Sequence, residues 1–169
     1  MLVYHPAFDL YHGVFRVLKL LNRSQKKNLE IEKLRLLDFY LLFPGLIPSI
    51  RLKREHQKYK RIFTELSNKY NIASVSGQAK QVFERIEPFN NLILTYLENK
   101  KYVKIHEETY LDFFSSELPK KILEICNVRD EKENKLMGFL SEVLSSYELK
   151  GADGLKARTG LMEYRYDNI

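Results

Sequence analysis

The sequence predicts a mainly α-helical domain of the α+β class, with a small β-hairpin or sheet from the C-terminal half of the chain. Two observations lead to this prediction. Apolar residues recur at helical spacing along most of the chain, and one stretch near residues 102–111 alternates as a strand does. The chain has 169 residues, 44% of them hydrophobic, with 10 Phe and 11 Tyr. This composition suits a compact core, and we expect one domain over residues 1–169.

The first half should hold three helices separated by turns. The first covers Pro6 to Leu21, with Pro6 in the first turn, where its missing N–H is not needed. Helical spacing predicts one buried stripe on this helix, formed by Phe8, Tyr11, Phe15, Leu18 and Leu21. The second helix covers about Leu29 to Phe43 and ends at Pro44, and the third covers Leu52 to Tyr70.

The second half begins with a helical segment from Gln78 to Lys100, which Pro88 should kink or split. A strand follows from Tyr102 to His106 and extends as far as Leu111. A strand directly after a third helix is the order found in winged-helix domains. We therefore expect a winged-helix-like arrangement of these elements.

The C-terminal part should add two helices and a last strand. A short helix covers Ser116 to Cys126, and an amphipathic helix runs from Asp130 to Tyr147. Gly151 and Gly154 end that helix because glycine favours helix termination. Residues 155–166 mix apolar and basic side chains, which predicts a closing strand.

The second predicted helix carries an apolar block, Leu36 to Pro44, that is interrupted only by Asp38. A helix that is apolar on every side is either central to the core or covered by another chain. Aromatic residues dominate binding energy at interfaces, so one hypothesis makes the block a partner interface through Phe39, Tyr40, Leu42 and Phe43. Core packing is the alternative for the same residues. A buried Asp38 would need a partner in either case.

A basic run follows the apolar block. It contains one acidic residue, Glu55, and six cations, Arg51, Lys53, Arg54, Lys58, Lys60 and Arg61. In a helix, Arg54, Lys58 and Arg61 would share one face and could follow the phosphates of DNA. The net charge of +6 favours nucleic acid or an acidic protein surface. An ordinary solvated helix face is the plain alternative.

The residues give no sign of catalysis, a metal or a cofactor. The four histidines are scattered, and no cysteine or carboxylate stands beside them at the spacing of metal ligands. Cys126 lies among apolar residues, whereas a nucleophilic cysteine needs a cationic, partly exposed setting. No phosphate loop, nucleophile elbow or carboxylate pair is present. We therefore expect a binding or assembly subunit and no enzyme.

The cellular compartment can be predicted from similar observations. One cysteine cannot form a disulfide within the chain, and the N-terminus lacks the basic region and cleavage site of a signal peptide. No uncharged apolar run reaches about 18 residues, so no membrane contact is expected. These features predict a cytoplasmic protein.

Three stretches together carry a family resemblance. They are YHPAFDLYHGVFRVLKLL (residues 4–21), LLDFYLLFP (residues 36–44) and GLKARTGLMEYRYD (residues 154–167). The chain resembles the middle component of bacterial ABC-three-component systems, to which the Lamassu anti-phage operons belong. The motifs span the chain and are of a packing type.

The resemblance implies a small, winged-helix-like accessory subunit without enzymatic activity. Its partners would be an ATPase similar to the structural-maintenance-of-chromosomes (SMC) proteins and an effector, often a nuclease. The subunit would dock on the ATPase heads, near the double-stranded DNA that they hold. Arg158 and Arg165 would belong to the tail motif and to a partner interface.

Two alternatives to this function stay open. The first is a free-standing winged-helix transcriptional regulator, which would form a homodimer and bind paired half-sites. The second is a hydrolase or nuclease, which would need carboxylates converging on a metal. Glu30, Glu32 and Asp38 are the candidates for such carboxylates, but they lie beside or within the apolar block.

Overall fold

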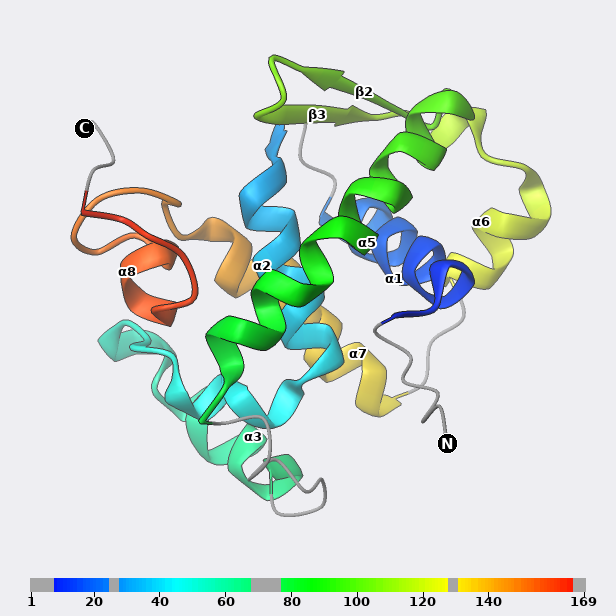
Figure 1. Cartoon of the computed structure of the whole chain (residues 1–169). Helices are drawn as coiled ribbons and strands as arrows, with labels where there is room; N and C mark the ends of the chain where they lie inside the picture. Colours follow the sequence, from blue (N-terminus) through cyan, green and yellow to red (C-terminus); the bar gives the residue numbers. More distant parts are fainter. Residues whose placement is uncertain (1–7, 25–27, 68–76, 128–130, 166–169) are drawn as a thin grey trace, which may run out of the picture.

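The computed structural model describes residues 8–24, 28–67, 77–127 and 131–165. The chain is mostly helical with a small antiparallel sheet, as predicted from the sequence (Figure 1). The α-helices are α1 (Leu10–Ser24), α2 (Ile31–Leu42), α3 (Lys58–Ser67), α5 (Ala79–Asn99), α6 (Lys120–Asn127), α7 (Glu131–Gly138) and α8 (Leu155–Thr159). The predicted boundaries at Pro6, Tyr70, Asp130 and Tyr166 lie outside the described residues.

Helix α2 is the centre of the core because it has no polar face. Leu34, Leu36, Leu37, Phe39 and Tyr40 are each 2% exposed or less. Helices α1 and α5 cover one side of α2, and α7 lies on another side (Figure 1). The turn η2 (Pro44–Ser49) follows, because the ring of proline cannot continue an α-helix from within.

The charged residue inside α2 has a partner within the chain. Asp38 is 1% exposed, and its two carboxylate oxygens accept hydrogen bonds from Arg16 Nε at 2.8 Å and Nη2 at 3.2 Å. Burial raises the pKa of Asp38, and the guanidinium of Arg16 opposes that rise. This ion pair meets the need that the sequence predicted for Asp38.

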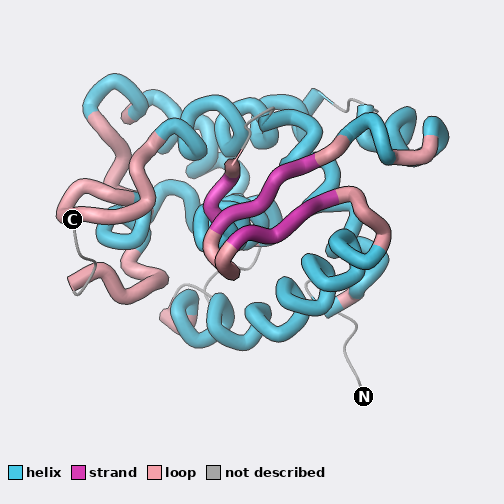
Figure 2. Tube along the Cα trace, turned by 90° about the horizontal axis from the view of Figure 1, so that it is seen from above, coloured by secondary structure: helices cyan, strands magenta, loops and turns pink. Residues whose placement is uncertain are grey.

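The sheet has three short strands, β1 (Leu29–Glu30), β2 (Val103–His106) and β3 (Tyr110–Phe113). Their order is β1-β3-β2, and every pairing is antiparallel (Figure 2). The order α1, β1, α2, α5, β2, β3 is compatible with the winged-helix-like arrangement expected from the sequence. The described residues 43–67, which include α3, lie between α2 and α5, and we call them the insertion.

Two helices differ from their predicted forms. Pro88 does not split α5, which runs without a break from Ala79 to Asn99, and the alternative, a kink at Pro88, stays a prediction. The helix expected from Leu52 begins only at Lys58, after the single 3₁₀ turn η3 (Arg54–His56). Leu52 is 5% exposed and lies in the extended link before that turn, because its side chain belongs to the core.

Two features near the C-terminus differ from the prediction. The segment predicted as a helix from Asp130 to Tyr147 is helical over residues 131–146, but α7 passes into a π-turn, η5 (Phe139–Val143), and a 3₁₀ turn, η6 (Leu144–Ser146). The hydroxyls of Ser141 and Ser145 bond to backbone carbonyls four residues earlier, a contact that disturbs regular helices. The expected closing strand is the helix α8, because Leu155, Lys156 and Ala157 are all buried and a strand would bury alternate residues only.

We predict that Arg16→Met lowers the free energy of unfolding by about 3–5 kcal/mol, because it leaves the carboxylate of Asp38 buried without its cation. Urea unfolding followed by circular dichroism measures the change. The double variant Arg16→Met/Asp38→Leu should regain much of the loss, since no buried charge remains. Equal destabilisation of the single and double variants would contradict this account.

The β2–β3 turn gives a second prediction. Glu107 and Glu108 have φ values of 49° and 56°, a conformation that favours Asn and Gly. Replacing them with Asn and Gly should raise the free energy of unfolding by about 1 kcal/mol, because the backbone strain is relieved. The pair Glu107→Gln/Glu108→Gln removes the same charges without that relief, and thermal unfolding should separate the two variants.

Candidate interaction surfaces

The basic run does not form one helical face. Arg51 and Lys53 lie in the extended link, Arg54 lies in η3, and only Lys58, Lys60 and Arg61 belong to α3. The sequence placed Arg54, Lys58 and Arg61 on one helix, and the change to a 3₁₀ turn at residues 54–56 overturns that placement. Whether each of the six cations can bind DNA therefore depends on the contacts that its side chain makes within the chain.

Arg51 and Arg158 hold each other's segments inside the chain. The backbone N–H of Arg51 donates to the carbonyl of Arg158 at 3.1 Å, and Arg51 Nη2 donates to the carbonyl of Ala157 at 2.7 Å. In return, Arg158 Nη1 donates to the carbonyl of Arg51 at 2.5 Å, and its Nη2 contacts Asp153 Oδ1 at 3.1 Å. Both guanidinium groups thus have internal partners that tie α8 to the insertion.

Tyr147 is a second connection in the same region. Its hydroxyl accepts the backbone N–H of Lys53 at 2.9 Å and contacts His56 Nδ1 at 2.8 Å. The cationic groups of Lys53 and Arg158 lie 4.8 Å and 5.4 Å from the ring centroid, within the range of cation–π attraction. Burial raises the pKa of Tyr147. Tyr147 therefore anchors η3 and the basic link to the core.

Four of the six cations lie on η3 and α3, and we call them the α3 basic surface: Arg54, Lys58, Lys60 and Arg61. Arg54, Lys58 and Arg61 are exposed and Lys60 is half-buried. Within the described part of the chain, none of the four forms an ion pair with a carboxylate. Their contact with DNA stays a prediction.

The residues predicted for a partner interface divide into two groups. Phe39 and Tyr40 are 2% and 1% exposed and belong to the core of the chain, the alternative that the sequence left open. Leu42 and Phe43 are half-buried, and the ring of Phe43 packs on that of Phe39 at 5.0 Å between centroids. Arg165 is exposed, with its backbone N–H bonded to Glu163 Oε1. A partner contact at Leu42, Phe43 and Arg165 stays a prediction.

Among the described residues, the aromatic side chain with the highest exposed fraction is on α1, where the sequence predicted a buried stripe. Leu18 and Leu21 are buried as expected, but Tyr11 is 81% exposed and Phe8 is 43% exposed. The stripe is therefore buried only toward the C-terminal end of the helix. A signal was present in the sequence, because Val14, Val17 and Leu20 form a second apolar row that competes for the core.

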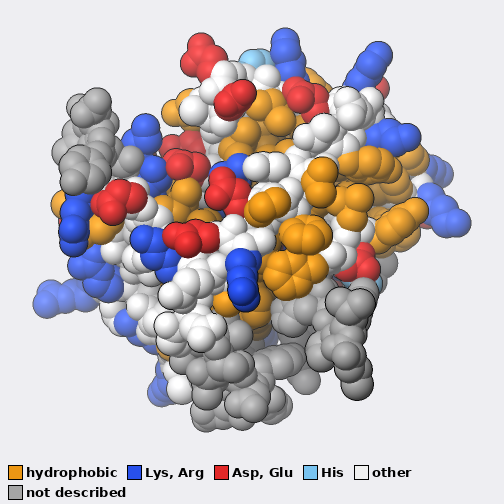
Figure 3. Space-filling model, viewed as in Figure 1, with side chains coloured by type: hydrophobic (Ala, Val, Ile, Leu, Met, Phe, Trp, Pro, Cys, Tyr) orange, Lys and Arg blue, Asp and Glu red, His pale blue; other side chains and the backbone are white. Residues whose placement is uncertain are grey.

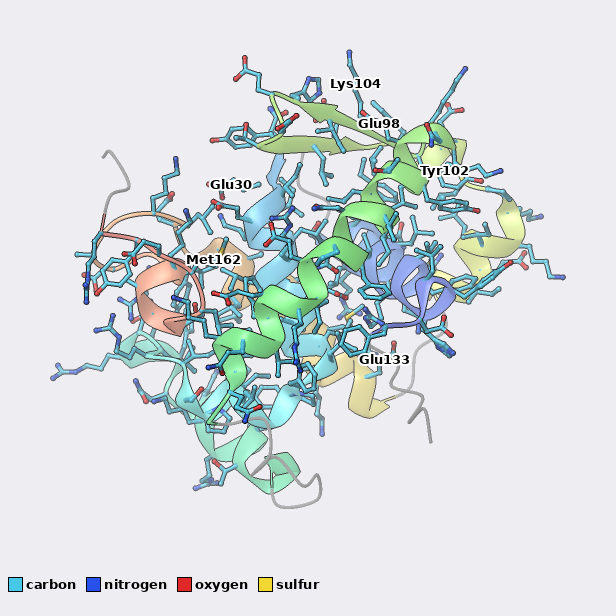
Figure 4. The ribbon with its side chains drawn as sticks, viewed as in Figure 1. Glu30, Glu98, Tyr102, Lys104, Glu133 and Met162 are labelled. Atoms are coloured by element: carbon cyan, nitrogen blue, oxygen red, sulfur yellow. The ribbon has the colours of Figure 1, made fainter. Side chains whose placement is uncertain are left out.

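The exposed part of α1 borders two hollows. One, of about 250 Å³, is lined by Leu10, Tyr11, Val14 and Phe15 of α1 together with Tyr96 and Ile122, and we call it the α1 groove. Tyr102 lies beside the end of α5 and also lines this groove (Figure 4). The other hollow, of about 470 Å³, shares Tyr11 and Phe15 and includes Lys19 and Glu133, which form an ion pair at 2.6 Å.

The carboxylates proposed for a metal site do not converge. Glu30 pairs with Lys33 at 2.5 Å, Glu32 pairs with Lys156 at 2.9 Å, and Asp38 pairs with Arg16. Among the described residues, no group of three or more His, Cys, Asp or Glu side chains is placed to hold a metal ion.

The thiol of Cys126 and the imidazole of His106 also have ordinary structural surroundings. Cys126 is half-buried, and burial raises the pKa of its thiol, which disfavours the nucleophilic thiolate. His106 Nε2 lies 3.0 Å from Asp112 Oδ2, and the pKa of Asp112 is lowered first by the N–H of Asn28 and then by His106. No helix in the described ranges is long and apolar enough to cross a bilayer.

These features define the class of protein: a small α+β chain with candidate binding surfaces. The model of a known family, ABC-three component (ABC-3C) system Middle Component 5, matches residues 2–167. The chain therefore belongs to this family, which makes it one component of a multi-subunit system in an antiviral-defence context. No curated protein and no solved structure matches the chain.

We predict that Tyr147→Phe lowers the free energy of unfolding by about 1–3 kcal/mol, because the backbone N–H of Lys53 loses its acceptor, the buried hydroxyl of Tyr147. Chemical unfolding measures the effect. Tyr110 is 43% exposed, so Tyr110→Phe serves as the control and should change stability little. A loss of similar size in both variants would show that the hydroxyl of Tyr147 has no special role.

Proposed function

We propose that the chain is a non-enzymatic accessory subunit of an SMC-like, Lamassu-type ATPase complex in anti-phage defence. It docks on the ATPase heads, assists the engagement of double-stranded DNA and takes part in control of a nuclease or other effector in the cytoplasm. Membership of the middle-component family over residues 2–167 is the observation that carries the proposal. It supplies the multi-subunit setting, and the α3 basic surface supplies a means of contact with DNA.

The position of the α3 basic surface supports this role. It lies on the insertion between α2 and α5, away from the exposed part of α1 (Figure 1). A protein partner can thus occupy one side of the chain while DNA meets another. Each lysine or arginine that neutralises a phosphate adds a salt-dependent increment of affinity, without any need to recognise sequence.

The alternative is a free-standing winged-helix transcriptional regulator, which the element order favours. In a helix-turn-helix protein the second helix of the motif enters the major groove. That helix would be α5, whose exposed charges are mixed, with acids at Glu84, Glu87 and Glu98. The β2–β3 turn adds Glu107 and Glu108, both exposed. These carboxylates would repel phosphates, so this alternative has less support.

Charge reversal tests the contact with DNA. We predict that Arg54→Glu/Lys58→Glu/Arg61→Glu weakens DNA retention by the assembled complex by at least about tenfold and reduces its dependence on salt, because phosphate contacts are lost. Fluorescence anisotropy with duplex DNA at several salt concentrations measures both effects. Because the three side chains are exposed, the fold should be unchanged.

The control is Lys104→Glu/Lys150→Glu, which reverses two exposed cations that belong neither to the α3 basic surface nor to the α1 groove. It should leave DNA retention unchanged. Loss of subunit assembly with normal DNA binding in the α3 variant would instead make the α3 basic surface a protein interface. An isolated homodimer that binds one operator sequence at nanomolar concentration would establish the regulator and exclude the accessory subunit.

A further inference from the structure

We infer that the α1 groove is the docking site for an amphipathic helix of the ATPase partner, with acidic residues beside the apolar face of that helix. The inference rests on the proposed function and deepens it by naming the surface and the chemistry of its occupant. It moves the protein interface from the apolar block of α2, whose Phe39 and Tyr40 are buried, to the exposed part of α1.

The apolar character of the surface is the first argument. Tyr11 is 81% exposed and Leu10 is 41% exposed, and on α5 Tyr96 is 41% exposed. Apolar side chains gather over α1 and α5 on the face shown in Figure 3. A contiguous exposed patch of this kind marks an interaction site, and tyrosine is among the residues that contribute most to binding.

The secondary structure of the groove walls indicates whether the partner binds as a strand or as a helix. They come from α1, α5 and α6, whose inner backbone groups are already bonded within each helix. An extended peptide binds by adding its backbone to a free strand edge, and this groove offers none within the described residues. A partner must therefore bind through side chains, as an amphipathic helix does when its apolar face lies in a groove.

The charged residues near the groove indicate which side chains the partner helix should carry beside its apolar face. Lys100 Nζ lies 5.7 Å from the ring centroid of Tyr96, which lines the groove. On α6, Lys121 directly precedes Ile122, which lines the groove. Both lysines are exposed, and neither has an ion pair among the described residues. Two exposed cations next to groove residues favour carboxylates on the partner.

The second hollow extends the same surface. Tyr11 and Phe15 line both hollows, so these two residues form a ridge with a recess on each side. The cations of the second hollow, Arg16 and Lys19, are matched by Asp38 and Glu133 and need no partner from outside. Lys100 and Lys121, beside residues of the α1 groove, have no such carboxylate among the described residues.

The experiment measures the affinity of this chain for the purified ATPase subunit of the proposed complex, by isothermal titration calorimetry. Tyr11→Ser should weaken binding by about tenfold or more, because it removes an aromatic anchor without disturbing the core. Ile62→Ser is the matched control, since Ile62 is 44% exposed on α3, away from the groove. It should bind as the wild type does. Equal melting temperatures confirm that both variants fold.

A charge variant tests the acidic partner. Lys100→Glu/Lys121→Glu should weaken binding severalfold and reverse the effect of added salt, because attraction becomes repulsion between like charges. Normal ATPase binding by this variant and by Tyr11→Ser would overturn the groove inference while leaving the proposed function intact. A wild-type chain that fails to bind the ATPase would overturn both. A wild-type dimer that Tyr11→Ser separates, with ATPase binding unchanged, would make the occupant a second copy.

Discussion

The absence of a polar face on α2 is the constraint on which the rest of the structure depends. A helix with buried residues on all sides has to be enclosed, and α1, α5 and the turns after α7 provide the enclosure. Asp38 would be costly in that position alone, so the bond to Arg16 fixes α1 against α2. Gly13 lets α1 approach α5 closely, because a Cβ there would meet Ile93 Cδ1 at 2.4 Å.

The same packing explains why α1 has an exposed half. The ion pair between Arg16 and Asp38 and the residues from Val17 to Leu21 hold the later part of α1 in the core. The first turn of α1 leaves Leu10 and Tyr11 at the surface. An apolar surface of this size on a family member that works with other subunits is consistent with an interface. The exposure of Leu10 and Tyr11 thus results from the way in which α1 covers α2.

The insertion is joined firmly to the core at both of its sides. Phe63 is 1% exposed, and its ring lies 5.1 Å from that of Phe139. At the other side, the contacts among Arg51, Arg158 and Tyr147 join the extended link to α8 and η6. Glu98 makes a comparable link elsewhere, since its carboxylate accepts the N–H of Ile105 and ties α5 to β2 (Figure 4). The α3 basic surface is consequently presented on a fixed support.

Sequence alone determined the helical class and the need of Asp38 for a partner, because both depend on local periodicity or on residue types, and the resemblance of three stretches indicated the family. Tertiary structure decided which cations stay open and which apolar residues stay exposed. Arg51 and Arg158 look like surface cations in the sequence, yet carbonyls from distant segments occupy them. Tyr11 fits a buried stripe by spacing, yet no element covers it among the described residues. Both outcomes depend on contacts between segments far apart in the chain, and helical spacing carries no information about such contacts.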